Sequence, residues 1–187
     1  MPDKISDARG CDWSDECEES KCETNLGIFS KFRFATLNPN ISGVVTIPIP
    51  VVPPDKPVVL AMLEIKIDDP KDVVWLTGVV GWNGVTNGTG LGKIDAIFSI
   101  FRNAPNTTTG QLIFSTRQST EAFPESEFET ASIDHVDSTP LTSHCQQTVT
   151  YFLTAQLPLP GSTGNVIGPI TFTAAEIERK SKHESDD

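Results

Sequence analysis

The sequence lacks the segments by which exported and membrane-bound chains are usually recognised. Met1–Gly10 is polar, with no apolar stretch of the kind that a signal peptide contains. The longest apolar stretches, Pro48–Pro54 and Val58–Leu63, are too short to span a bilayer. Clusters of lysine and arginine that would dock on an anionic membrane are also missing. We therefore expect a chain made in the cytoplasm, without a membrane partner, whose export needs another route, such as lysis of the producing cell.

Positive charge is scarce throughout the chain. Its 187 residues include 25 acidic and 14 basic side chains, which gives a formal net charge of -11. The excess is largest at the ends: residues 1–25 hold eight acids and three bases, and residues 176–187 hold five and three. An acidic chain repels phosphate backbones, so nucleic acid is an unsuitable partner.

No segment with helical periodicity is long enough for a core helix, and no repeat of 20–50 residues is visible. Residues alternate between apolar and polar instead, most clearly in Gln147–Leu157, where one face carries Val149, Tyr151, Leu153, Ala155 and Leu157. Phe98 lies on the regularly apolar face of another alternating stretch. About eight strands are predicted: Val44–Val52, Val58–Ile67, Val73–Trp82, Ile94–Arg102, Gln111–Gln118, Phe128–Ile133, Gln147–Leu157 and Val166–Ala174.

These strands predict an all-β fold, an antiparallel two-sheet jelly-roll-like sandwich, with an immunoglobulin-like sandwich as the alternative. Because prolines 48 and 50 cannot donate to a ladder, the first strand belongs at an edge or outside a sheet. Gly84–Gly92 is predicted to be a loop, and Ala174–Arg179 a short helical turn. We expect three parts: a flexible, cysteine-containing N-terminal arm (1–25), the β-sandwich domain (26–177) and an acidic tail (178–187).

Signatures of catalysis are missing as well. His135 and His144 flank a segment with Asp137 and Ser138, but there is no G-x-S-x-G nucleophile pattern, and loop histidines in solvent are the favoured interpretation. The glycines of 84–92 do not have the dinucleotide-binding spacing. We therefore expect no enzymatic activity and no cofactor.

Two further groups of residues have a structural and a functional interpretation. Asp68, Asp69 and Asp72 cluster at a strand boundary; a solvated turn is favoured over a calcium site, because no EF-hand register is present. Trp75 and Trp82 are expected to fill the core rather than to bind sugar.

The four cysteines are the candidate functional residues. Cys11, Cys17 and Cys22 lie in the arm with C-x5-C-x4-C spacing, and Cys145 lies in the domain. This is not the C-x2-C of zinc sites, and the arm has no histidine. Reduced thiols and a metal site assisted by arm carboxylates remain alternatives to disulfides formed in an oxidising setting, which we favour. An odd number in the arm leaves at least one for Cys145 or for another chain.

Five motifs in the stretch from Val73 to Ile177 resemble surface proteins of bacterial endospores, namely the exosporium and spore-coat β-domain proteins. The motifs are Gly78–Trp82, Ile97–Arg102 with Ile113–Gln118, Ser126–Glu129, Thr150–Leu157 and Asn165–Phe172. The resemblance implies a non-enzymatic jelly-roll building block, assembled in the mother cell with itself and with other spore-surface proteins. The cysteine-containing arm is similar to that of spore-appendage subunits, whose N-terminal connectors are implied to form disulfides between subunits. Pro48–Pro57 and the acidic tail depart from the pattern of a surface-layer protein, so the spore structure it joins stays open.

Three functions are thus in competition. The first is a self-assembling structural protein cross-linked through the arm. The second is a carbohydrate-binding module with Trp82 and Gly84–Gly92 as its contact face, and an enzyme is the weakest.

Overall fold

Strands are the regular secondary structure of the described part of the chain. The computed structural model describes residues 28–53, 56–86, 92–121, 128–138, 140 and 146–179. These residues form nine strands: β1 (Ile28–Thr36), β2 (Ile47–Pro48), β3 (Val58–Ile67), β4 (Val73–Thr86), β5 (Lys93–Arg102), β6 (Gln111–Glu121), β7 (Phe128–Asp137), β8 (Gln147–Gln156) and β9 (Thr163–Glu178). No helix long and apolar enough to cross a membrane occurs in the described ranges.

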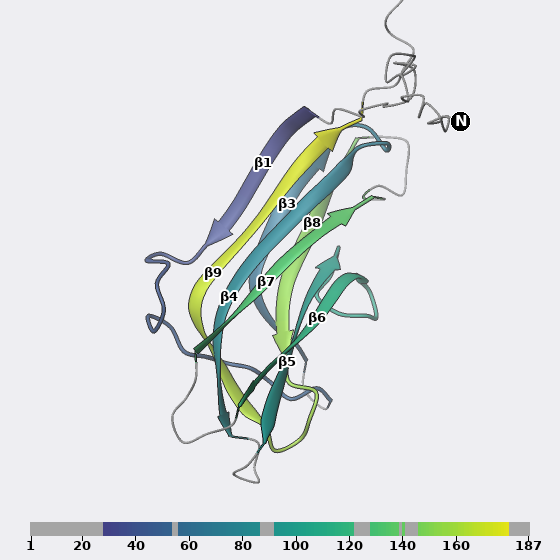
Figure 1. Ribbon diagram of the computed structural model, residues 1–187. Coiled ribbons are helices and arrows are strands. Elements are labelled where there is room, and N and C mark those ends of the chain that lie inside the picture. The colour runs from purple at the N-terminus through teal and green to yellow at the C-terminus, as the bar shows by residue number, and fades with distance from the viewer. Residues whose placement is uncertain are drawn as a thin grey trace, which may run out of the picture.

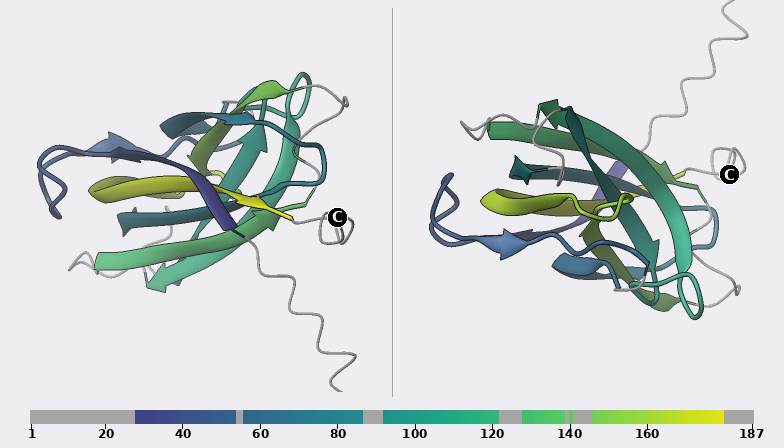
Figure 2. Two further views of the ribbon diagram at one scale, coloured as in Figure 1. Left: turned by 90° about the horizontal axis from the view of Figure 1, so that it is seen from above. Right: turned by 90° about the horizontal axis from the view of Figure 1, so that it is seen from below.

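Two antiparallel sheets pack face to face (Figures 1 and 2). The first sheet has the order β1-β9-β4-β7, with β2 added at β9, and the second has the order β3-β8-β5-β6. The long strands pair as nested hairpins: β1 with β9, β3 with β8, β4 with β7, and β5 with β6. This nesting of eight strands over two sheets is the jelly roll, so the predicted fold is confirmed and the immunoglobulin-like alternative is wrong.

The core lies between the sheets and consists of the inward residues of the alternating strands. Its largest fully buried side chains include Trp82, Tyr151, Phe98 and Phe172. The rings of Trp82 and Phe98 meet edge to face, with centroids 5.9 Å apart. The predicted inward faces of Gln147–Leu157 and of Phe98 are therefore confirmed, as is the core position of Trp82.

Several strands extend beyond their predicted ends. β9 continues to Glu178, so the helical turn predicted over Ala174–Arg179 is wrong. Its backbone is paired with β1 on one side and β4 on the other, and this tertiary pairing overrides local preference. β7 likewise runs four residues past its predicted end, to Asp137. β4 continues to Thr86 through Gly84, where a Cβ would lie 2.6 Å from the Thr120 side chain.

The N-terminal edge of the first sheet was not predicted as a strand. β1 pairs with β9 along most of its length, with an irregularity between Phe29 and Lys31. Seven of its nine residues are exposed, so it lacks the buried face by which a strand is recognised. By contrast, the edge position predicted for Val44–Val52 is confirmed, because Ile47–Pro48 pairs with β9 and Val51 adds only an isolated bridge to Leu157.

Candidate functional site

The cysteine positions predicted to form cross-links cannot be compared with the fold. Cys11, Cys17, Cys22 and Cys145 all lie outside the described residues, as do most of the predicted arm and tail. The disulfide prediction and the predicted boundaries of the arm and tail therefore stay predictions.

Asp137, between the two histidines considered above, lies in a network with Arg102 and Tyr151. This carboxylate is buried and accepts hydrogen bonds from the Arg102 Nη1 and from the Tyr151 hydroxyl, each 2.8 Å from its Oδ2. His135 lies within β7, with its ring centroid 5.3 Å from that of Phe114, so the prediction of a loop histidine is wrong. His144 lies outside the described residues.

The network around Asp137 joins the two sheets at one corner of the sandwich. Arg102 on β5 donates through Nη1 to Asp137 on β7 and through Nη2 to Gln111 on β6, while Tyr151 donates from β8. The side chains of Arg102 and Asp137 are both 4% exposed. Burial and the neighbouring Asp137 charge raise the pKa of the Tyr151 hydroxyl far above its usual value, which keeps it a donor. The cluster is therefore a structural clamp.

A second polar cluster ties β1 to the rest of the molecule. Glu176 on β9 is fully buried and accepts hydrogen bonds from the Ser30 hydroxyl (2.8 Å) and the Asp68 amide (3.0 Å). Lys31 Nζ lies 2.9 Å from Glu176 Oε2 and 2.6 Å from Asp68 Oδ2. Desolvation lowers the pKa of Lys31, but its hydrogen bonds to the two carboxylates outweigh this, so the net pKa is raised. Hydrogen bonds from Lys31 and then Gln146 lower the pKa of Asp68.

The predicted aspartate turn is only partly solvated. Asp68 and Asp69 are exposed, whereas Asp72 is 3% exposed, and its Oδ1 accepts a hydrogen bond from the Arg179 amide. Burial raises the pKa of Asp72. Within the described ranges, no group of three or more His, Cys, Asp or Glu side chains is arranged to hold a metal ion.

The Lys31 cluster makes a testable contribution to stability that depends on pH. We expect Lys31→Met to lower the melting temperature by about 5 °C at neutral pH, because it leaves Glu176 buried without its cation. The contribution of Asp68 is present above its unfolded pKa of about 4 and is lost as the pH falls through its lowered folded pKa. The contribution of Lys31 is present below its unfolded pKa of about 10.4, and it is lost as the pH rises through its raised folded pKa.

Thermal unfolding from acid to alkaline pH checks this prediction. The difference in melting temperature between wild type and Lys31→Met should be largest between about pH 4 and pH 10. It should become smaller at more acidic and at more alkaline pH. Lys66→Met, at a nearby exposed lysine, is the control and should change the melting temperature far less. A difference that is constant at all pH values would contradict the assigned ion pairs.

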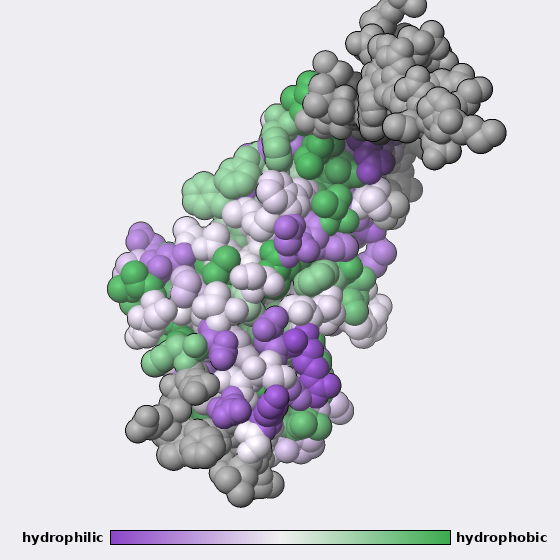
Figure 3. Space-filling view, viewed as in Figure 1, coloured by the Kyte–Doolittle hydropathy of each residue, from purple (hydrophilic) through white to green (hydrophobic). Residues whose placement is uncertain are grey.

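The outer face of the first sheet is apolar over the half nearest the start of β1. We call this surface the aromatic face: Phe29, Phe32 and Phe34 of β1, Trp75 of β4, Val136 of β7, and Ala175 of β9 between them. The strand register places Phe32, Ala175, Trp75 and Val136 in one row across all four strands. The three phenylalanines are 60%, 57% and 64% exposed. Figure 3 views this side of the molecule, where apolar side chains gather beside β1.

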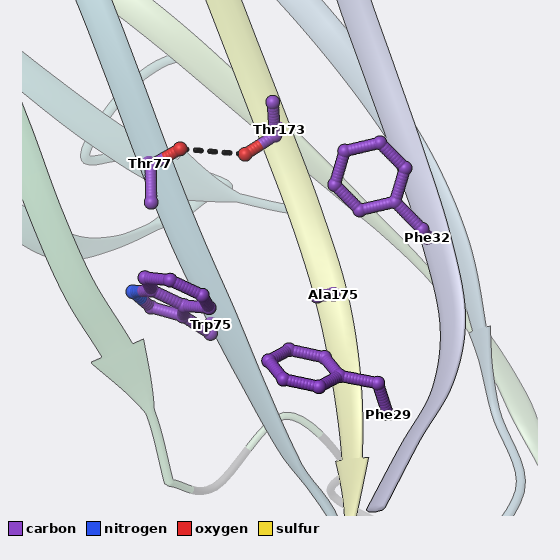
Figure 4. A pocket seen from close by; sticks show the side chains of 6 residues that line it. All are labelled: Phe29, Phe32, Trp75, Thr77, Thr173 and Ala175. Carbon is purple, nitrogen blue, oxygen red and sulfur yellow. Dashed lines mark hydrogen bonds between the residues drawn. The ribbon is translucent and has the colours of Figure 1, made fainter.

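A groove of about 470 Å³ runs along the aromatic face between β1 and β4 (Figure 4). Phe29 and Phe32 form one wall and Trp75 the other, while the small side chains of Ala175 and Thr173 form the floor. The hydroxyls of Thr77 and Thr173 are 2.6 Å apart and bond to each other. The indole of Trp75 donates to Asp134 Oδ1 at 2.6 Å. These polar groups satisfy one another, so the groove presents mainly apolar surface.

The two tryptophans therefore divide between the core and the surface. The core prediction is wrong for Trp75, which lines the groove, because β4 residues alternate between the inward and the outward face of the sheet. Trp82 is fully buried, so the alternative in which this residue contacts sugar is wrong. Sequence reasoning missed the aromatic face, although three phenylalanines within six residues of β1 were its signal.

The outer face of the second sheet carries a narrower apolar stripe. Its members align by strand register: Met62 on β3, Phe152 on β8, Phe101 on β5 and Leu112 on β6. Met62 and Leu112, at its two ends, are 53% and 47% exposed, whereas Phe101 between them is buried. The molecule thus has exposed apolar side chains on both outer faces.

Comparisons with known proteins assign this chain to no family. No family model matches the chain, and no curated protein matches it. Among solved structures, Eiger TNF from S. frugiperda aligns over 83% of this chain and 99% of its own, with a TM-score of 0.43 and 7% identity. The infectious bursal disease virus Gt strain structure aligns over 82% of this chain and 39% of its own, with a TM-score of 0.42 and 10% identity.

Proposed function

We propose that this protein is a self-assembling structural subunit that associates through the outer faces of its sandwich. The aromatic face is the observation that carries this proposal. Each of its phenylalanines, 57–64% exposed, leaves roughly 100 Å² in water. Exposed apolar patches of several hundred Å² mark interaction surfaces in soluble proteins.

Charge supports association through apolar surfaces. Copies with a formal net charge of -11 repel one another, so contact requires surfaces where charges are few or paired. At the rim of the aromatic face, the Asp134 carboxylate accepts a hydrogen bond from the Trp75 indole. An interface with an apolar centre and a polar rim has this composition.

We further propose that the subunit belongs to the surface of a bacterial endospore, in the exosporium, coat or appendages, with itself and other spore-surface proteins as partners. The spore-protein motifs between Val73 and Ile177 support this assignment. The three arm cysteines support disulfides between subunits, because an arm of about 25 residues reaches roughly 80 Å when extended. Such bonds would keep the assembly together under heat and denaturant.

Glycan binding is the second candidate function, with the groove of the aromatic face as the contact site in place of Trp82. The rings of Trp75 and Phe29, with centroids 5.9 Å apart, offer faces on which a sugar ring can stack. A glycan affinity that Trp75→Ala abolishes in a chain that does not self-associate would favour this candidate over assembly.

The arm disulfides are tested in the full-length chain by replacing Cys11, Cys17 and Cys22 with serine. On a non-reducing gel, oxidised wild type is expected to run as a ladder of covalent oligomers. The triple variant is expected to lose this ladder, because its arms cannot form disulfides with one another. Cys145→Ser alone is the matched control and should retain links between arms. Multimers of the triple variant that survive boiling in detergent without reductant would contradict the role of the arm.

A further inference from the structure

The aromatic face has a ridge beside its groove. Phe32 and Phe34 project from β1 as stacked rings with centroids 6.2 Å apart, and Phe34, at 64% exposed, is the most exposed phenylalanine of β1. The groove lies next to this ridge, over Ala175 and Thr173. Figure 4 shows the rings of Phe29, Phe32 and Trp75 around the small floor residues.

We infer that a second copy of this chain binds the aromatic face through its own aromatic face, around a two-fold axis. A ridge and a groove side by side are self-complementary: rotation by a half-turn brings the ridge of each copy over the groove of the other. A two-fold interface requires such a surface, in which each patch contacts its equivalent on the partner. This inference rests on the proposed self-assembly and names the contact that forms its basic unit.

The size of the surface fits an interface between two copies. Phe29, Phe32 and Phe34 together expose roughly 300 Å² of side chain, and Val136, at 45% exposed, adds to it. A stable interface covers about 800 Å² on each partner. The aromatic face therefore supplies the apolar centre, and Asp134 supplies part of the polar rim.

The apolar stripe on the second sheet of another copy would fit the groove less well than the aromatic face does. Phe101 in the middle of the stripe is only 5% exposed, and the exposed members, Met62 and Leu112, lie on strands at opposite edges of the sheet. The stripe therefore has no central ridge to enter the groove. Two-fold pairing through the first sheet leaves the second sheet of each subunit free for further contacts.

Sedimentation equilibrium of the full-length chain with reductant present tests the pairing without interference from disulfides. Wild type should form a reversible dimer. Phe34→Glu should weaken this dimer by about 100-fold, because each copy would place a carboxylate in an apolar interface. Met62→Glu is the matched control, since it introduces the same charge at a residue 53% exposed on the other outer face, and it should dimerise like wild type. Phe32→Glu should repeat the effect of Phe34→Glu.

Far-UV circular dichroism and melting of each variant show whether the fold is retained, and Phe32→Glu provides a second reading if Phe34→Glu is unfolded. A Phe34→Glu dimer as tight as that of wild type would overturn the pairing. An equal loss of dimer affinity in Met62→Glu and Phe34→Glu would also overturn the pairing. It would indicate that the outer face of one sheet contacts the outer face of the other sheet in the partner. A wild type that is monomeric with reductant but forms the covalent ladder without it would overturn this pairing and leave only the proposed linking of subunits through arm disulfides. A wild type with neither dimer nor ladder would overturn both.

Discussion

Replacing Arg102 with methionine is expected to destabilise the protein by about 3–5 kcal/mol. The guanidinium and the Asp137 carboxylate are paired at 2.8 Å, and both side chains are 4% exposed. Methionine would leave the Asp137 charge buried without its cation, and the cost of burying an unpaired charge is large. The substitution also removes the donor to Gln111, which releases β6 from the clamp. Chemical denaturation, followed by circular dichroism or fluorescence, measures the loss.

Arg117→Met is the matched control for this experiment. Arg117 also pairs with an aspartate, Asp95, but its side chain is 55% exposed, and a solvated pair contributes at most about 1 kcal/mol. The double variant Arg102→Met with Asp137→Leu should recover part of the loss, because it removes both buried charges together. Similar small losses for Arg102→Met and Arg117→Met would contradict the clamp.

Truncation of Phe98 to alanine is expected to cost about 3–5 kcal/mol, which is the range for a buried aromatic residue. Phe98 is fully buried, and its ring packs edge to face against Trp82 from the opposite sheet. The substitution creates a cavity between the sheets and removes this aromatic contact. A chain of 187 residues should then melt roughly 10 °C lower.

Met62→Ala is the control for the core substitution. Met62 is 53% exposed on the outer face of the second sheet, so its truncation should cost far less than that of Phe98. Tyr151→Ala should resemble Phe98→Ala, because Tyr151 is also fully buried and in addition donates to Asp137. A melting temperature unchanged by Phe98→Ala would show that this face of β5 does not lie in the core.

The sequence by itself determined the fold class and most of the core. Alternation with a period of two is a local property, so Gln147–Leu157 showed its inward face before any pairing was known. Prolines 48 and 50 showed the edge position of their segment for an equally local reason, the missing backbone donors. The charge and cysteine content of the arm was also readable, but its role in cross-linking remains a prediction.

Tertiary structure decided the features that depend on pairing between distant segments. Asp137 contacts Arg102 across 35 residues, and Glu176 contacts Ser30 across 146, so no local pattern indicated that Arg102, Asp137 and Glu176 are buried. β1 became a strand only through its pairing with β9. The row of Phe32, Ala175, Trp75 and Val136 exists because strand register brings four separate segments side by side. Local alternation gives each strand two faces, but only the packing of the two sheets decides which face is left to a partner.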